Sequence, residues 1–153
     1  MNRYYQTCNV IFFLRVKDEY GWLSNMSQYY LNVRDKFYPT VEHFYQFLRF
    51  IEHPDTAENI RLTLSPISAK LLAYENLNLT RNDWDKEKVK IMRFCLKEKF
   101  YPYEEFALMI KQTSEPIVEI SYKSQFWGAK PFNGTFVGQN VLGRLLMEIR
   151  GNL

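Results

Sequence analysis

The sequence contains few of the residues that build metal centres, disulfides or histidine-based catalytic sites. Its 153 residues include two cysteines, Cys8 and Cys95, and two histidines, His43 and His53. The cysteines are far apart and lack metal-ligand spacing, so free thiols in a reducing compartment are the favoured interpretation. A lone helix histidine such as His43 is more often a structural residue than a base or ligand. We therefore expect no metal site.

Phosphate-loop, nucleophile and membrane motifs are absent as well. With six glycines, the chain has no glycine-rich phosphate loop and no nucleophile elbow. The apolar run at residues 10–14 is too short for a membrane helix, and no small-residue cleavage site follows it. We expect a cytoplasmic protein without a membrane partner.

Aromatic residues, in contrast, are abundant. They make up 17% of the chain, with 12 Phe, 11 Tyr and 3 Trp. This content excludes a disordered chain, and a chain of this length forms one domain by default. The net charge of +3 permits an anionic small ligand or weak contact with nucleic acid, but requires neither.

Helical patterns outnumber strand patterns along the chain. The predicted helices span residues 41–52, 55–61, 66–74, 84–99, 102–111 and 141–150. The predicted strands span residues 9–16, 29–33, 36–38 and 117–122, of which the middle two form a hairpin. Because helices and strands do not alternate regularly, we predict a helix-rich α+β fold, with residues 1–153 forming a single domain.

One predicted helix carries the most informative residues. Pro39 and Thr40 mark its start. An apolar stripe with helical period follows: Phe44, Phe47, Leu48 and Ile51. Glu42, Gln46 and Arg49 fall on the opposite face. From spacing alone, this polar face is expected to be solvated.

Aromatic or amide side chains occur in four short segments, 21–25, 81–84, 126–128 and 138–140, of which 81–84 also carries charges. Aromatic rings stack on planar bases, amides read hydrogen-bonding edges, and a helix N-terminus suits phosphate. Each segment also has a structural interpretation, since Trp84 and Trp127 could be core residues and Asp83 and Asn140 could be helix caps. Together the segments favour a nucleotide-like or glycosidic ligand.

In order and spacing, these segments resemble the YbiA-like or NADAR domain family, from about Tyr20 to Asn152. The matching residues are Gly21-Trp22-Leu23-Ser24-Asn25, Tyr38-Pro39-Thr40-Val41-Glu42-His43-Phe44-Tyr45-Gln46, Ser65-Pro66 with Ala69-Lys70, Arg81-Asn82-Asp83-Trp84, Lys88, Met92, Lys99-Phe100, Glu119, Trp127-Gly128 and residues 138–150. The last segment, GQNVLGRLLMEIR, is the most specific.

The resemblance implies an α+β domain with short, mostly antiparallel strands that hydrolyses N-glycosidic bonds without a metal or organic cofactor. Family substrates include ribosylamino-pyrimidine phosphates of riboflavin synthesis and ADP-ribose attached to guanine. Glu42 would then face the ligand pocket as the catalytic carboxylate, with Asp83 as the second candidate. The residues expected to bind the substrate are Ser24, Asn25, Gln46, Arg81, Trp84, Ser124, Phe126, Trp127 and Asn140.

Two departures from the family pattern leave alternatives open. Ser124 stands where the family usually has an Asp three residues before the Trp-Gly pair, and Ala73-Tyr74 replace a common Gly-Arg pair. A second hypothesis is therefore a non-catalytic module that binds ADP-ribose or a nucleotide. A third is a protein that acts on ADP-ribosylated guanine in nucleic acid, which the net charge permits.

Overall fold

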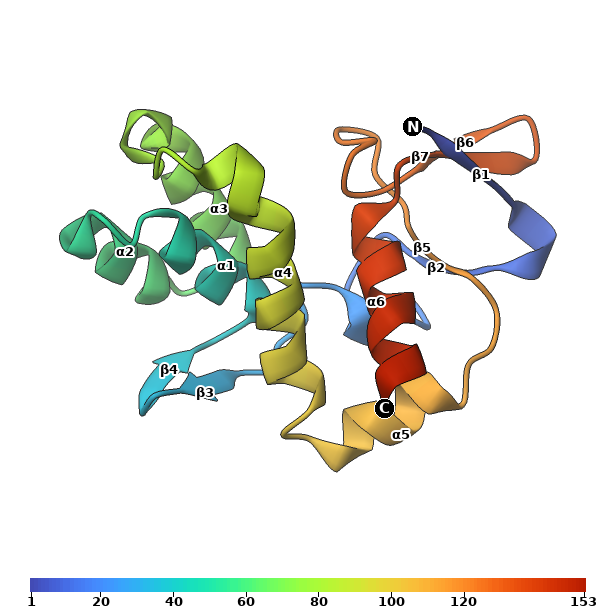
Figure 1. Cartoon of the computed structure of the whole chain (residues 1–153), viewed down its shortest axis with the longest axis horizontal. Helices are drawn as coiled ribbons and strands as arrows, with labels where there is room; N and C mark the ends of the chain where they lie inside the picture. The colour runs from blue at the N-terminus through green and yellow to red at the C-terminus, as the bar shows by residue number, and fades with distance from the viewer. The chain divides into compact units, whose positions relative to one another are not determined.

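A computed structural model describes all residues from Met1 to Leu153, and its backbone contacts divide the chain into two compact units. The middle unit comprises Asn25–Pro102, and the terminal unit comprises Met1–Ser24 together with Tyr103–Leu153. Figure 1 shows their helices and strands.

The middle unit is built around helix α1 (Val41–Arg49). Helices α2 (Pro54–Arg61), α3 (Pro66–Glu75) and α4 (Trp84–Phe100) all pack against it, as Figure 1 shows. A short 3-10 turn, η3 (Leu77–Leu79), connects α3 to the segment before α4. Because three helices contact α1, little of its surface remains for solvent.

Side-chain caps fix the starts of α1 and α3 where the sequence predicts them. The Thr40 hydroxyl accepts a hydrogen bond from the His43 backbone N–H at 3.3 Å, and the Ser65 hydroxyl accepts one from the Ser68 N–H at 3.0 Å. Helix α1 ends at Arg49, earlier than predicted, because the Phe50 N–H turns back to the Phe47 carbonyl at 3.2 Å.

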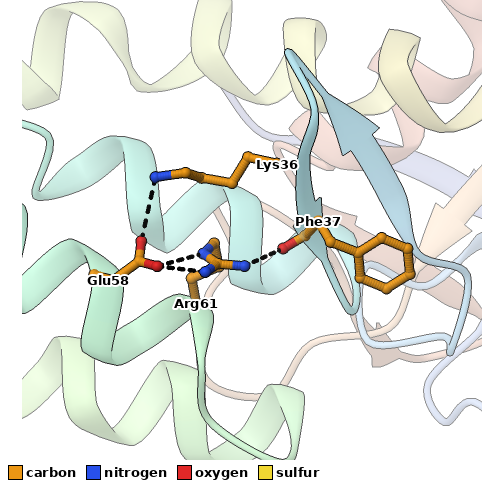
Figure 2. Close-up of polar contacts among 4 residues, drawn as sticks. All are labelled: Lys36, Phe37, Glu58 and Arg61. Atoms are coloured by element: carbon orange, nitrogen blue, oxygen red, sulfur yellow. Dashed lines mark hydrogen bonds and ion pairs between the residues drawn. The ribbon is translucent and has the colours of Figure 1, made fainter.

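The hairpin β3 (Leu31–Val33) and β4 (Lys36–Tyr38) is held to α2 by a polar cluster. Figure 2 shows Glu58 between Lys36 and Arg61, while Arg61 also donates to the Phe37 carbonyl at 2.8 Å. The Arg61 hydrogen bond is the main cause of the lowered pKa of Glu58.

The predicted turn between β3 and β4 is present, with φ of 52° at Arg34 and 61° at Asp35.

The terminal unit contains two small sheets and two helices. One sheet has the antiparallel order β1-β7-β6, from strands β1 (Arg3–Gln6), β6 (Lys130–Phe132) and β7 (Thr135–Gly138). The other pairs β2 (Ile11–Phe13) with β5 (Ile117–Glu119) in parallel. The remaining elements are η1 (Thr7–Asn9), η2 (Gly21–Leu23), α5 (Glu104–Lys111) and α6 (Val141–Asn152), the last packing on β5.

Strand β2 is shorter than the predicted strand at 9–16. A 3-10 turn precedes it, and the Asp18 carboxylate ends it by accepting the N–H groups of Leu14 and Arg15 at 2.9 and 2.7 Å. These bonds also lower the pKa of Asp18. The β1-β7-β6 sheet was not predicted at all.

The α+β prediction is confirmed, and the strand pairings are mostly antiparallel. None of the helices combines the length and the apolar character that crossing a membrane requires.

Candidate functional site

The middle unit buries a carboxylate and an amide on the same face of α1. Glu42 is 7% exposed and Gln46 is 3% exposed, so the solvated face that spacing alone suggests is wrong. Gln46 Nε2 donates a hydrogen bond to Glu42 Oε1 at 2.9 Å. The Glu42 backbone N–H in turn donates to the Asn25 carbonyl at 3.0 Å, which joins α1 to the loop before β3.

The protonation of Glu42 is set by opposing influences. Burial raises the pKa of its carboxyl, whereas the Gln46 hydrogen bond and the positive charges of Lys70 and Arg49 lower it. Burial dominates, so the pKa lies above the ordinary value of 4.5. A carboxyl tuned upward in this way suits proton transfer near neutral pH.

Two buried amide oxygens in this unit have no hydrogen-bond partner. They are Asn25 Oδ1 and Gln46 Oε1, although the amide nitrogens of both side chains are engaged. Buried polar atoms are nearly always satisfied, so two unsatisfied acceptors beside a buried carboxylate need an explanation. A ligand that brings hydroxyl or amino donors would provide it.

An aromatic and cationic layer adjoins the carboxylate. The rings of Tyr45 and Trp84 lie 4.9 Å apart between centroids, and Trp84 is 7% exposed. The Arg49 guanidinium carbon lies 5.2 Å from the centroid of Trp84. Burial raises the pKa of Tyr45, which keeps its phenol neutral.

Arg81 and Asp83 form an exposed ion pair at the start of α4. Arg81 donates to the Asp83 carboxylate at 2.5 and 2.8 Å, and this contact lowers the pKa of Asp83. The Asp83 side chain is 45% exposed and does not cap the helix. Asp83 therefore differs from Glu42 both in solvent access and in being paired already with a cation.

In the terminal unit, Ser124 organises a turn. Its hydroxyl accepts the Trp127 N–H at 3.2 Å, and its backbone N–H donates to the Ser121 hydroxyl at 2.9 Å. The Phe126 and Trp127 rings meet edge to face at 5.0 Å. Because an Asp carboxylate accepts the same kind of hydrogen bond, the turn is compatible with the Asp that the sequence resemblance leads us to expect at this position.

Asn140 holds the start of α6 against β5. It is fully buried, and its side chain accepts the Glu119 N–H at 3.1 Å and donates to the Ile117 carbonyl at 2.8 Å. Its φ of 50° lies in the left-handed region, which Asn tolerates better than most residues. Asn140 was expected to bind the substrate, but both polar groups of its side chain are engaged with the backbone.

The N-terminus of α6 is likewise occupied. The N–H groups of Val141 and Leu142 donate to the carbonyls of Phe126 and Trp127 at 3.1 and 3.0 Å. Gly143 fits here because a Cβ atom would lie 2.2 Å from the Ile117 carbonyl oxygen. These amide groups are therefore used in the fold itself.

Ser24, which ends η2, is 8% exposed, and its N–H donates to the Gly21 carbonyl at 3.0 Å. The structure thus brings Asn25, Glu42, Gln46 and Trp84 into one unit and places Ser24, Ser124, Phe126, Trp127 and Asn140 in the other.

Other titratable side chains have structural surroundings. His43 is fully buried, with its ring nitrogens 2.9 Å from the Thr40 hydroxyl and 3.1 Å from the Thr63 carbonyl. Burial lowers its pKa, so the ring is neutral. No cluster of three or more His, Cys, Asp or Glu side chains has the geometry to hold a metal ion.

Arg49 and Lys70 are the residues of this region that the sequence analysis did not select. Both are close enough to Glu42 to lower the pKa of its carboxyl. The signal for Arg49 was its place on the polar face of α1, two turns after Glu42. Lys70 belongs to the Ala69-Lys70 pair that matches the family pattern, but the sequence did not place it near Glu42, because α3 meets α1 only in the folded chain.

Comparison with known proteins agrees with this fold. The NMR structure of the Escherichia coli protein YbiA superposes with a TM-score of 0.81 at 30% identity, covering 94% of this chain and 84% of YbiA. N-glycosidase YbiA from Escherichia coli is 32% identical over 145 residues, covering 94% of this chain and 88% of that protein.

Two further relatives come from other organisms. An N-glycosidase from Nostoc punctiforme is 33% identical over 143 residues, covering 92% of this chain and 90% of that protein. The chloroplastic riboflavin biosynthesis protein PYRR from Zea mays is 32% identical over an alignment of 164 positions, which covers 97% of this chain but only 26% of the maize protein.

The shared α+β fold defines the structural class of the chain. The NADAR domain model matches residues 12–153, so this protein belongs to the NADAR domain family, as the sequence resemblance predicted.

Proposed function

We propose that this protein hydrolyses the N-glycosidic bond of a ribosylated or ADP-ribosylated base. The observation that carries the proposal is the buried Glu42–Gln46 pair, together with the two unsatisfied amide oxygens in the same unit. The relatives named N-glycosidase support the same class of reaction.

The reaction breaks the bond between the ribose anomeric carbon and the base nitrogen, and a water oxygen bonds to that carbon. The base leaves with the bonding electron pair and takes up a proton at its nitrogen. Positive charge develops on the sugar, and the water must lose a proton. In this proposal Glu42 stabilises the charge and accepts the proton, which its raised pKa favours. Gln46 holds the carboxylate in place through its amide nitrogen.

The free acceptors suggest how the substrate is held. Asn25 Oδ1 and Gln46 Oε1 would each accept a hydrogen bond from a hydroxyl or amino group of the substrate. Trp84 would offer an aromatic surface beside the sugar or base. Asp83, exposed and paired with Arg81, remains the second candidate for the carboxylate role.

One observation favours a second function, binding without catalysis. Ser124 stands where the family usually has a carboxylate, and its hydroxyl caps a turn. If that carboxylate is needed for chemistry, the protein would bind ADP-ribose or a nucleotide without turning it over.

A panel of N-glycosides separates the two functions. The protein is incubated with riboflavin-pathway ribosylamino-pyrimidine phosphates, ADP-ribosylated guanosine and NAD, and released base is measured by chromatography. The proposal predicts release from at least one ribosylated base. Stabilisation by ADP-ribose in a thermal-shift assay, without release from any compound, would favour the binding module.

ADP-ribosylated guanine within DNA is one member of the substrate class, and its use can be tested separately. Contacts to phosphates would make the affinity for DNA fall as salt increases. Absent or salt-insensitive binding would exclude DNA as the carrier of the substrate.

A further inference from the structure

We infer that Met92 is a positioning residue of the candidate site, because its thioether sulfur fixes the orientation of the Asn25 amide. That orientation makes the site select a substrate group that donates a hydrogen bond over one that accepts. The inference rests on the proposed function, in which Asn25 Oδ1 accepts from the substrate, and adds the residue that decides which end of the amide the substrate meets.

The Asn25 side chain has a single hydrogen-bond partner in the protein. Its Nδ2 donates to Met92 Sδ at 3.3 Å, while its Oδ1 is buried and accepts no hydrogen bond. Met92 lies in the middle of α4 and is itself buried. The contact therefore joins the loop before β3 to α4, inside the middle unit.

The chemistry of sulfur decides how this amide points. An amide has a donor at one end and an acceptor at the other, whereas a thioether has no hydrogen to donate and can only accept. Turning the amide over would bring Oδ1 of Asn25 against the sulfur of Met92, where no hydrogen bond can form, and would leave both ends of the amide without a partner. Unsatisfied buried polar groups are costly, so Met92 holds the nitrogen toward α4 and leaves the oxygen as the acceptor.

Other contacts hold the backbone of this loop, so the amide orientation is what remains for Met92 to set. The Asn25 carbonyl accepts the Glu42 N–H at 3.0 Å. Two residues after Asn25, the Ser27 hydroxyl accepts a hydrogen bond from Lys99 Nζ at 2.9 Å. Lys99 follows Met92 by two turns on the same face of α4. A change confined to the sulfur should therefore turn the amide without displacing the loop.

Nuclear magnetic resonance on the wild-type chain tests the orientation, and it needs no ligand. The side-chain amide protons of Asn25 should show nuclear Overhauser contacts to the ε-methyl group of Met92, because the nitrogen faces the sulfur. Amide protons that lack this contact would overturn the inference.

A double-mutant cycle tests whether the orientation matters for binding, with ADP-ribose as the probe and calorimetry as the measurement. Met92→Leu keeps a buried apolar side chain of similar volume and removes the acceptor. It should lower the affinity about fivefold, and Asn25→Ala should lower it at least as much. The double variant should bind no more weakly than Asn25→Ala alone, because Met92 acts only through that amide.

Met147→Leu is the matched control, since it makes the same change on α6 and should bind as the wild type does. Thermal melting must show that each variant is folded. A methionine that only packs the core would add its loss to that of Asn25→Ala. Additive losses, or a Met92→Leu protein with wild-type affinity, would therefore overturn the positioning role.

Failure of this role and failure of the proposed function have different signatures. Release of base by Met92→Leu with wild-type kcat/KM would overturn the positioning role and leave the hydrolysis intact. Coupled losses of ADP-ribose affinity in the cycle, without release of base from any N-glycoside, would uphold the role of Met92 and overturn the hydrolysis.

Discussion

Gln46, one helical turn after Glu42, donates a 2.9 Å hydrogen bond from its Nε2 to Glu42 Oε1. The oxygen of the same amide is buried and accepts no hydrogen bond. The glutamine therefore orients the carboxylate with one end, and the other end has no hydrogen-bond partner within the protein. Buried amides that serve only the fold satisfy both ends, as Asn140 does.

The first prediction concerns that hydrogen bond. Replacing Gln46 with Met keeps the length of the side chain and removes the donor that lowers the pKa of Glu42. The pKa of Glu42 should therefore rise further, and the acidic limb of the kcat/KM profile should move to higher pH. A pH–rate profile of Gln46→Met that superposes on that of the wild type would contradict the assignment of Glu42 as the titrating base.

Stability should also depend on the ionisation of Glu42. Because its pKa is raised in the folded state, its contribution to stability is fully present below the ordinary value of 4.5 and is lost as pH rises through the raised pKa. Gln at this position does not titrate, so the melting temperature of Glu42→Gln should rise relative to that of the wild type as the pH increases above 4.5. Parallel melting curves for the two proteins across this range would be inconsistent with a raised pKa.

Asn140 should prove to be a structural residue. Asn140→Ala removes two side-chain hydrogen bonds to the backbone of β5 and places Ala at a positive φ. The expected loss in the free energy of unfolding is about 2–4 kcal/mol, measured by urea denaturation. If Asn140→Ala keeps wild-type stability and instead weakens ligand binding, the predicted role in substrate binding would be favoured.

Ser124 offers a test of the missing family carboxylate. Ser124→Asp should preserve the turn, because a carboxylate can accept the Trp127 N–H as the hydroxyl does. If a carboxylate here stabilises the developing positive charge, hydrolysis should increase through kcat rather than through affinity. Ser124→Ala is the matched control, and it should lose the cap at a cost of about 0.5–2 kcal/mol in stability. A folded Ser124→Asp protein that binds ligand normally and gains no activity would favour the binding module.

Local signals predicted the helices well, because their starts are encoded in neighbouring residues. Thr40 and Ser65 cap α1 and α3 as the sequence indicates. The β1-β7-β6 sheet escaped prediction because β1 pairs with a strand near the other end of the chain, from Arg3 opposite Gly138 to Gln6 opposite Thr135. Such pairing leaves no short-range pattern to read.

The candidate site was predictable in part. Periodicity separated the polar face of α1 from its apolar stripe, but it could not show that this face is buried, because α2, α3 and α4 approach the helix only in the fold. The family resemblance led us to expect that Glu42 faces a ligand pocket; the structure shows that Glu42 is buried, and its role in a site stays a prediction. The cations around it come from two helices, so no single segment of sequence contains the site.

The most direct test of the account is the turnover of Glu42→Gln on a ribosylated base that the wild type hydrolyses. The amide is nearly isosteric but cannot accept the water proton, so kcat should fall by about 100-fold or more. Glu75→Gln, an exposed change on α3, is the control and should turn over as the wild type does. A folded Glu42→Gln protein with wild-type kcat would contradict the central claim that Glu42 performs the chemistry.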